Sequence, residues 1–562
     1  MKKKLLAATA LAALLNLPSF GAGADGPILQ LRLRMPDTQS DETWASTLGI
    51  IRENPGCCDE VWFSTGIGYP PLAVHAERAR RMVRAAEDLR RIGVVPSLQI
   101  QATIGHSDEI GALEDCSAKD WTGWTSSTGF ADRVCSCPRD PRFLAYFREV
   151  SKLYAAFAPG SVWIDDDLRC DGHMPASAHR DPRPGCWCDR CIADFNRETG
   201  VAWTRETLLR AVGTDEALLA KWKSFCVGSL VGVARTIAGA FHETSPATTM
   251  GLQLSTLQGE TAIRRILEGL HEESGHPVGY RPGGDAYYDD NPNEQVRKSM
   301  RAGRFRRTIG DPPWVKTWTP EIESWPRVYG SRSAQATLIE GFAALMYGMN
   351  AMSMLVIQTG NEPPSLYSRR VLAPIAKAAP FLKGYARACA ESTAVGFGTD
   401  GDIDAALRFA ATGIPLNVGV GRVEGNVSGE ELETDYHQET TLRIQDLRDA
   451  LDRRAGGSPA VLESPFVGHM MLRVSSDGTL RLVSLLNVRI EEQGPLTLRL
   501  RNVPAGQESV MWREMNRAPV ALPLVRTGNV VRVTVPAISA WNAGWIEFRN
   551  CAERKGFRFP AL

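Results

Sequence analysis

Three consecutive aspartates, Asp165, Asp166 and Asp167, directly follow the apolar run SVWI at 161–164. Successive residues of a strand point to opposite sides, so Asp165 and Asp167 should share one direction and Asp166 should take the other. Carboxylates this close cannot all ionise normally, so one pKa should be raised. A carboxyl group with a raised pKa can act as a general acid near neutral pH. The alternative is a loop whose charges are solvated or paired with Arg169.

Two glutamates follow another strand-like run, WVKTWT at 314–319. Glu321 and Glu323 lie just past Pro320. If this run and 161–164 belong to one barrel, their acids should face each other across its mouth. Glycoside hydrolysis requires such a pair, in which one carboxyl protonates the leaving oxygen and the other attacks the sugar or activates water. Glu323 also fits the acidic first turn of a helix.

Other polar and aromatic side chains at predicted strand ends are candidates for holding a substrate. With Asp165 and Asp166, the candidate substrate-binding residues are Arg281, Tyr287, Trp325, Gln358 and His106. Aromatic faces stack on sugars, but they also fill barrel cores, and core packing is the simpler interpretation for each of Trp163, Trp318, Trp325, Tyr287 and Tyr288. A structural role for His106 is at least as plausible as substrate binding.

A tight thiol cluster follows the aspartates. In CWCDRC, Cys186, Cys188 and Cys191 are spaced for one tetrahedral zinc ion rather than for disulfides among the three. A fourth ligand is needed, and the earlier segment RVCSCPRDPRF supplies Cys135 and Cys137. Because the chain carries 12 cysteines and is expected to be exported, two disulfides among these cysteines are the alternative.

The elements that must position these residues alternate along the chain. Eight strand-like runs are each followed by a helical pattern between about 28 and 390, which predicts a (β/α)8 barrel over 25–390. The runs lie at 28–35, 57–65, 94–106, 161–167, 248–255, 276–284, 314–319 and 351–359. An open doubly wound sheet is the competitor, but no glycine-rich phosphate turn follows the first run.

The remaining chain predicts two smaller domains. Short strands separated by helical pieces indicate a small, flavodoxin-like α/β domain at 391–466. Alternating patterns with an Asp477-Gly478 turn indicate a β-sandwich at 467–562. The length of 562 residues is itself too great for a single core.

The net charge of the chain and its N-terminal segment restrict the partners and the location that the protein can have. Lys+Arg and Asp+Glu both number 64, so no basic field is expected to attract nucleic acid. The N-terminus has a basic start, an apolar stretch and small residues at Ala22 and Ala24, which is typical of a signal peptide over 1–24. Its apolar stretch is short for a membrane anchor. We therefore expect a periplasmic or secreted protein with no membrane association after cleavage.

The segment WIDDDLR…CWCDRCIADFNRETG resembles the family 42 glycoside hydrolases, the β-galactosidase family. That resemblance implies a barrel, then an α/β domain used in oligomer contacts, then a small β domain. It singles out Cys137, in the CPRDPRF stretch, as the fourth zinc ligand. Asp167 stands where the family has its acid/base glutamate, and Glu321 corresponds to the nucleophile by strand position only.

These observations predict an exported, exo-acting and retaining glycosidase that acts on an oligosaccharide or glycan. Asp167 is the expected general acid/base and Glu321 the expected nucleophile, with Glu323 as the substitute. Structural zinc is expected and no organic cofactor. The alternative is a barrel that binds glycan without hydrolysing it, which the aspartate in place of glutamate at position 167 motivates.

Overall fold

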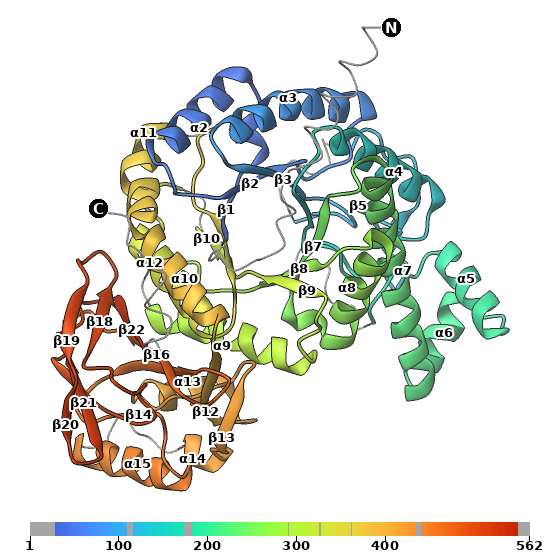
Figure 1. The fold of residues 1–562 in the computed structure, drawn as a ribbon. Helices are drawn as coiled ribbons and strands as arrows, with labels where there is room; N and C mark the ends of the chain where they lie inside the picture. Colours follow the sequence, from blue (N-terminus) through green and yellow to red (C-terminus); the bar gives the residue numbers. More distant parts are fainter. Residues whose placement is uncertain are drawn as a thin grey trace, which may run out of the picture.

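A computed structural model describes residues 28–108, 116–173, 183–289, 291–324, 328–360, 362–433 and 441–548. The predicted signal peptide and Trp325 lie outside these residues. Within them, a curled parallel sheet is surrounded by a ring of helices, and a second unit of two sheets packs against one side (Figure 1).

The parallel sheet forms the barrel. Its neighbouring strands, in order, are β10 (Glu321–Glu323), β11 (Ala351–Leu355), β1 (Ile28–Arg32), β2 (Glu60–Ser64), β3 (Val95–Ile100), β6 (Ser161–Ile164), β7 (Thr249–Ser255), β8 (Val278–Gly283) and β9 (Val315–Trp318). Strands β9 and β10 are consecutive in the chain and are separated only by Thr319 and Pro320. The predicted seventh strand therefore closes the barrel, with β9 paired to β8 and β10 paired to β11.

With β9 and β10 taken as one interrupted strand, each barrel strand is followed by a helix on the outside of the sheet (Figure 1). These helices are α2 (Asp41–Glu53), α3 (Leu72–Arg91), α4 (Pro141–Ala155), α7 (Glu216–Thr244), α8 (Glu260–Ser274), α9 (Pro292–Thr308), α10 (Ala334–Met346) and α12 (Ala373–Ala390). The eight predicted strand–helix units are thereby confirmed in order and type. Short helical turns at η1 (Met35–Thr38), η2 (Thr256–Gln258), α11 (Pro364–Tyr367) and η3 (Ser368–Leu372) complete the connections.

Helix α7 is long and apolar enough to span a membrane by length and composition alone. In this fold it packs between α4 and α8, and its Trp222, Val233 and Ile237 side chains are fully buried. Burial of this kind is what a core helix of the barrel wall requires, and it accounts for the apolar composition of α7.

The barrel interior is filled by side chains, as the fold requires. The indole of Trp163 stacks on Trp62, with ring centroids 4.5 Å apart. A Cβ atom at Gly251 or Gly279 would lie only 2.3 or 2.4 Å from that indole, so these positions on β7 and β8 must be glycine. Trp163 and Trp318 are 2% and 1% exposed, which makes both of them core residues rather than sugar platforms.

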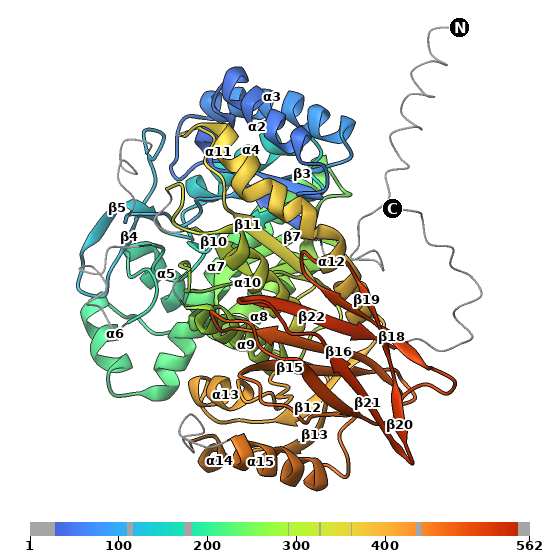
Figure 2. The same ribbon diagram turned by 90° about the vertical axis from the view of Figure 1, so that its left-hand side faces the viewer.

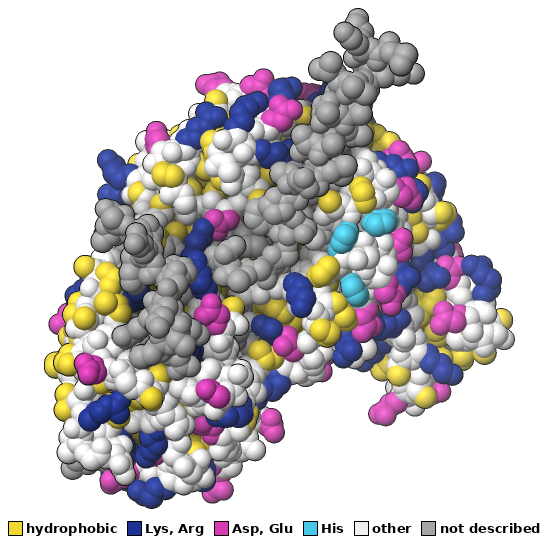
Figure 3. Space-filling model, in the orientation of Figure 1, with side chains coloured by type: hydrophobic (Ala, Val, Ile, Leu, Met, Phe, Trp, Pro, Cys, Tyr) yellow, Lys and Arg dark blue, Asp and Glu magenta, His cyan; other side chains and the backbone are white. Residues whose placement is uncertain are grey.

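Two insertions extend the barrel near the aspartates. A hairpin of β4 (Gly123–Thr125) and β5 (Ala131–Ser136) follows β3, and helices α5 (Asp189–Thr199) and α6 (Arg205–Val212) follow β6. The two helices project from the side of the barrel (Figures 1 and 2). Figure 3 shows acidic and basic side chains interspersed over one face, without a large field of either sign.

The C-terminal region differs from the predicted pair of domains. Its seven-stranded sheet has the order β13 (Arg422–Asn426), β12 (Thr393–Gly398), β15 (Gly468–Val474), β16 (Leu480–Asn487), β22 (Asn542–Glu547), β18 (Ser509–Glu514) and β19 (Val520–Pro523). A four-stranded sheet has the order β14 (Ala460–Leu462), β17 (Leu496–Leu500), β21 (Val530–Val535) and β20 (Val525–Thr527). Helices α13 (Ile403–Ala410), α14 (Gly429–Glu433) and α15 (Thr441–Arg454) lie beside them (Figure 2).

Both sheets cross the predicted boundary at 466. Strand β12 pairs antiparallel with β15, and β14 pairs antiparallel with β17. Val395 and Leu462 are buried in the same core cluster as Leu498 and Ile546. The prediction of a separate flavodoxin-like domain at 391–466 is therefore wrong, since this segment supplies strands to the sandwich instead of forming its own sheet.

Candidate active site at the barrel mouth

Arg281, on β8, connects the acids that the sequence placed on different strands. Its side chain is fully buried. Nη2 donates to Asp165 Oδ1 at 3.3 Å, Nη1 donates to Glu321 Oε1, and Nε donates to Gln253 Oε1 at 3.0 Å. Asp165 and Glu321 are thus separated by no more than two hydrogen bonds and the width of one guanidinium group.

Glu321 is surrounded by hydrogen-bond donors and cations from neighbouring elements. Besides the Arg281 contact, its Oε2 accepts a hydrogen bond from the Gly284 amide at 3.0 Å and from the Tyr287 hydroxyl at 2.8 Å. Burial raises the pKa of Glu321, but Arg281, Lys298 and Arg32 outweigh burial and hold it below its ordinary value. Glu321 is therefore an ionised carboxylate with a fixed orientation.

Glu323 occupies the same side of the barrel and is paired with Arg32. It is 6% exposed, and one carboxylate oxygen lies 3.6 Å from Nη1 of Arg32. The same Nη1 lies 3.8 Å from Glu321, while Nε of Arg32 donates to Gln99 at 3.1 Å. The sequence analysis did not include Arg32, although a charged residue within the apolar alternation ILQLRLRM signalled an inward-facing cation.

Asp165 faces this network directly. Its Oδ2 accepts a hydrogen bond from Gln99 Nε2 at 2.9 Å and lies 4.0 Å from Nε2 of His106. Asp165 is 5% exposed and therefore sits at the floor of the mouth. Strands β6 and β10 thus bring Asp165 and Glu321 to the two sides of Arg281.

Asp166 points to a different partner, His173. Its Oδ1 lies 2.7 Å from His173 Nε2. Burial raises the pKa of Asp166, but the hydrogen bond and charge of His173, with Arg281 and Arg169 further away, lower it well below its ordinary value. Burial lowers the pKa of His173, but Asp108 and Asp166 overcome this and raise it to about 10. The sequence analysis did not single out His173, which follows no periodic pattern.

Asp167 is placed where it cannot meet a substrate. It is fully buried, and both carboxylate oxygens accept hydrogen bonds from the loop after β3. The Thr103 hydroxyl donates to Oδ1 at 2.6 Å, and the amides of Thr103 and Gly105 donate to Oδ2 at 2.5 and 2.8 Å. Burial does raise the pKa of Asp167. However, a group with no exposed surface has no path to a glycosidic oxygen, so this geometry argues against Asp167 as the general acid.

The other candidate residues are divided between the mouth and its rim. Tyr287 contacts Glu321 as described, whereas Gln358 accepts a hydrogen bond from Arg34 Nη1 at 3.0 Å and is 7% exposed. The His106 ring stacks on His173, with centroids 4.6 Å apart. Gln358 is therefore already bound to a protein partner, and His106 belongs to a local cluster with His173.

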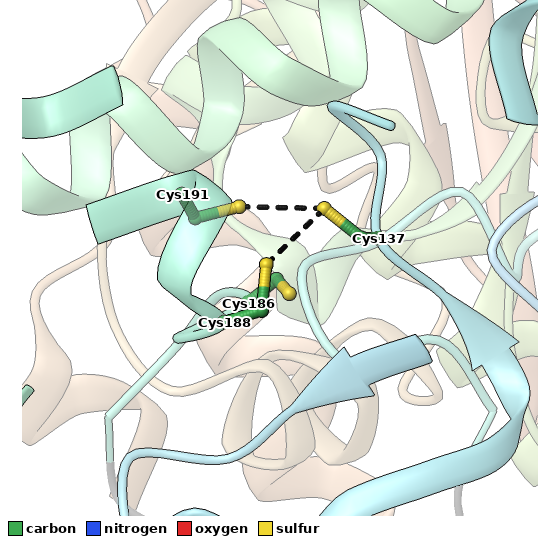
Figure 4. A group of neighbouring side chains, drawn as sticks. All are labelled: Cys137, Cys186, Cys188 and Cys191. Carbon is green, nitrogen blue, oxygen red and sulfur yellow. Dashed lines mark hydrogen bonds between the residues drawn. The ribbon is translucent and has the colours of Figure 1, made fainter. Parts of the chain in front are cut away.

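The four cysteines predicted to bind zinc come together (Figure 4). Their Sγ atoms all lie within 4.8 Å of one another, and Cys137 Sγ is 3.5 Å from the Sγ atoms of both Cys188 and Cys191. The cluster is completed by Cys186, and all four side chains are buried. Cys135 is excluded, because its thiol donates to the Gly105 carbonyl at 3.5 Å.

Removing the guanidinium of Arg281 should destabilise the barrel strongly, because the buried Glu321 would lose its closest cation and the buried Asp165 would lose its ion-pair partner. For Arg281→Met we expect a loss of about 3–5 kcal/mol in the free energy of unfolding, measured by denaturant titration. Arg264 pairs with Glu268 on the exposed face of α8 and is a suitable control. Arg264→Met should cost about 1 kcal/mol or less. Equal losses in the two variants would contradict the role given to Arg281.

Comparisons with known proteins support the fold but not a family. No protein-family model matches the sequence, and a search of curated proteins gave no match. Among solved structures, α-L-fucosidase isoenzyme 2 from Paenibacillus thiaminolyticus is similar at a TM-score of 0.57 and 12% identity, covering 93% of this chain and 100% of that chain. The β-galactosidase from Bacillus circulans sp. alkalophilus is similar at a TM-score of 0.53 and 10% identity, covering 91% and 99%. At these identities the likeness shows a shared fold, found here in glycosidases, and does not single out family 42.

Proposed function

We propose that this protein is a retaining glycoside hydrolase whose nucleophile is Glu321. The observation that carries the proposal is the setting of Glu321 just past the carboxyl end of β9, on the side of the barrel where active sites of this fold occur. Its carboxylate is ionised, and the Tyr287 hydroxyl, the Gly284 amide and Arg281 fix its direction. A nucleophile in glycoside hydrolysis must be both ionised and oriented, because it attacks the anomeric carbon from one side.

We assign the proton donor to Asp165 rather than to its two neighbours. Asp166 is committed to His173, and Asp167 is enclosed by the loop after β3. Asp165 shares Arg281 with Glu321, which supports the short separation of about 5–5.5 Å that retaining enzymes use. In the first step Asp165 would donate its proton to the leaving glycosidic oxygen. In the second step the same residue would accept a proton from the water that hydrolyses the glycosyl–enzyme bond at Glu321.

A panel of nitrophenyl glycosides tests the proposed activity. Purified protein should release nitrophenol from at least one glycoside, and Glu321→Gln should abolish that release while keeping the fold. Binding of a sugar without turnover of any substrate in the panel would instead favour the glycan-binding alternative, in which Arg281 serves only to neutralise two buried acids. The same panel would identify the sugar.

We further propose that the four-cysteine cluster holds a structural zinc ion. Four thiolates at about 2.3 Å from zinc stand about 3.8 Å apart in a tetrahedron, and the observed 3.5 Å between sulfur atoms is close to this value. A disulfide would require about 2.05 Å. Zinc there would join the β4–β5 hairpin to α5, and with four protein ligands it would leave no position for a catalytic water.

Metal analysis should find about one zinc ion per chain in protein purified without chelators. Cys137→Ser should lose that zinc, because three thiolates hold it less well than four. Cys135→Ser is the matched control, since Cys135 is buried two residues before Cys137, on β5, but lies outside the cluster. Mass spectrometry that found the four cysteines joined in disulfides would overturn the zinc proposal.

A further inference from the structure

Two histidines and an aspartate meet beside the acid network. His106 and Asp108 follow β3, and His173 follows β6. One ligand atom from each lies within 4.8 Å of the other two. None of the roles proposed above for Glu321, Asp165 or the cysteines uses this cluster.

Backbone hydrogen bonds hold the three residues in place. The His173 amide donates to the Gly105 carbonyl at 2.8 Å, and the His173 carbonyl accepts from the amides of Ser107 and Asp108 at 2.7 and 3.2 Å. These bonds form a short parallel bridge between His106 and His173. The cluster is therefore preorganised by main chain, and it does not depend on flexible side chains meeting by chance.

Both imidazoles turn the same ring nitrogen toward Asp108. His173 Nδ1 lies 3.4 Å from Asp108 Oδ2, and His106 Nδ1 lies 3.9 Å from Asp108 Oδ1. The rings are nearly parallel, with an angle of 14° between their planes. Two Nδ1 atoms and a carboxylate thus converge on one point at the rim of the barrel mouth.

The opposite ring nitrogens face carboxylates. His173 Nε2 lies 2.7 Å from Asp166, and His106 Nε2 lies 4.0 Å from Asp165. Metal-bound histidines almost always donate their other N–H group to a carboxylate or a carbonyl, which fixes the ring and its tautomer. His106 is only 6% exposed, and its Nε2 has no hydrogen-bond partner among the described residues. A small movement of the ring toward Asp165 would give that nitrogen its acceptor.

We propose that His106, Asp108 and His173 form a site for a divalent transition-metal ion. Two imidazole nitrogens and one carboxylate are a donor set that suits zinc, manganese, iron or cobalt, and they leave further coordination positions open. The distances between the ligand atoms, such as 3.4 Å from His173 Nδ1 to Asp108 Oδ2 and 3.9 Å from His106 Nδ1 to Asp108 Oδ1, are longer than those between the ligands of a bound metal ion. Binding of the ion would therefore draw the three side chains closer together. Asp166 would then accept a hydrogen bond from Nε2 of His173, and Asp165 would accept one from Nε2 of His106.

Manganese binding to the full-length, zinc-loaded protein tests this site without any substrate. Mn²⁺ prefers nitrogen and oxygen ligands and should not replace zinc among four thiolates. The loss of the free Mn²⁺ signal in electron paramagnetic resonance should show about one bound ion per chain. Asp108→Asn and His173→Gln should each weaken Mn²⁺ binding at least about tenfold. Even the mutation of residues that only hydrogen-bond to metal ligands lowers metal affinity by about 10–100-fold. Asp108 is 40% exposed, so its replacement should not affect folding.

His242→Gln is the matched control, because His242 is an exposed histidine at the end of α7. It should bind Mn²⁺ as the unaltered protein does. A parallel titration with Co²⁺, followed by visible absorption, should give the same ranking of variants. If neither ion binds the unaltered protein more tightly than Asp108→Asn, the cluster is an ion-pair network and the metal proposal is overturned. Because no glycoside is used, this outcome leaves the proposed hydrolase activity untouched.

Discussion

Glu321→Gly should be almost inactive on its own and should regain activity when azide is added. Loss of an enzymatic nucleophile lowers kcat on the order of 10⁶-fold, as in a serine protease from which it is removed. The glycine leaves a space beside Gly284 and Tyr287 that a small anion can enter. Azide would then attack the sugar from the side that Glu321 occupied. The expected product is a glycosyl azide of inverted configuration, identified by nuclear magnetic resonance.

Glu323→Gly provides the matched control for this experiment. Glu323 lies two residues further along β10 and contacts Arg32 at 3.6 Å, whereas the Tyr287 hydroxyl and the Gly284 amide donate to Glu321. It should lose less activity and show no azide product. Rescue of Glu323→Gly but not of Glu321→Gly would transfer the nucleophile role to Glu323.

Asp165→Asn should lower activity by about 10²–10⁴-fold on glycosides with poor leaving groups, which is the usual contribution of general acid catalysis. Asparagine keeps the shape of the side chain but carries no proton to donate. Glycosides with good leaving groups need less protonation, so their first step should suffer much less. Steady-state kinetics on a series of substituted phenyl glycosides would show this dependence on the leaving group.

Asp167→Asn separates the proton donor from a structural carboxylate. Asp167 accepts hydrogen bonds from Thr103 and Gly105, and the amide group of asparagine can replace only one accepting oxygen. We expect a loss of stability and a similar loss of activity on every substrate. If Asp167→Asn instead shows the dependence on the leaving group and Asp165→Asn does not, Asp167 is the proton donor after all.

The barrel was predictable from sequence because its signals are local. Each strand is a short apolar run, each helix has a periodic apolar face, and eight such units in succession have few topological solutions. The cysteine cluster was predictable for the same reason, since three of its four members lie within six residues. In both cases spacing along the chain reflects spacing in the fold.

The C-terminal region was mispredicted because its pairing is not local. Strand β12 pairs with β15 across more than 70 residues, and β14 pairs with β17 across the boundary that composition suggested. Nothing in the strands themselves identifies these partners. Short strands between helical pieces are equally compatible with a separate α/β domain and with strands added to a sandwich.

The directions of the three aspartates were mispredicted for a different reason. Strand β6 ends at Ile164, and the chain turns immediately, with the Leu168 amide donating to the Asp165 carbonyl at 3.3 Å. The alternation of a strand therefore does not apply beyond Asp165. Asp165 faces the mouth, whereas Asp167 is turned into the loop that follows β3.

The most direct test of the account is to trap the sugar on the enzyme. A 2-deoxy-2-fluoro glycoside with a good leaving group, built on the sugar found in the glycoside panel, should slow the second step more than the first. Mass spectrometry of the digested protein should then find one fluorosugar on the peptide that contains Glu321, and none in Glu321→Gln. A fluorosugar attached to Asp165 or Glu323, or steady hydrolysis without any attached sugar, would contradict the assignment of Glu321 as the nucleophile of a retaining glycosidase.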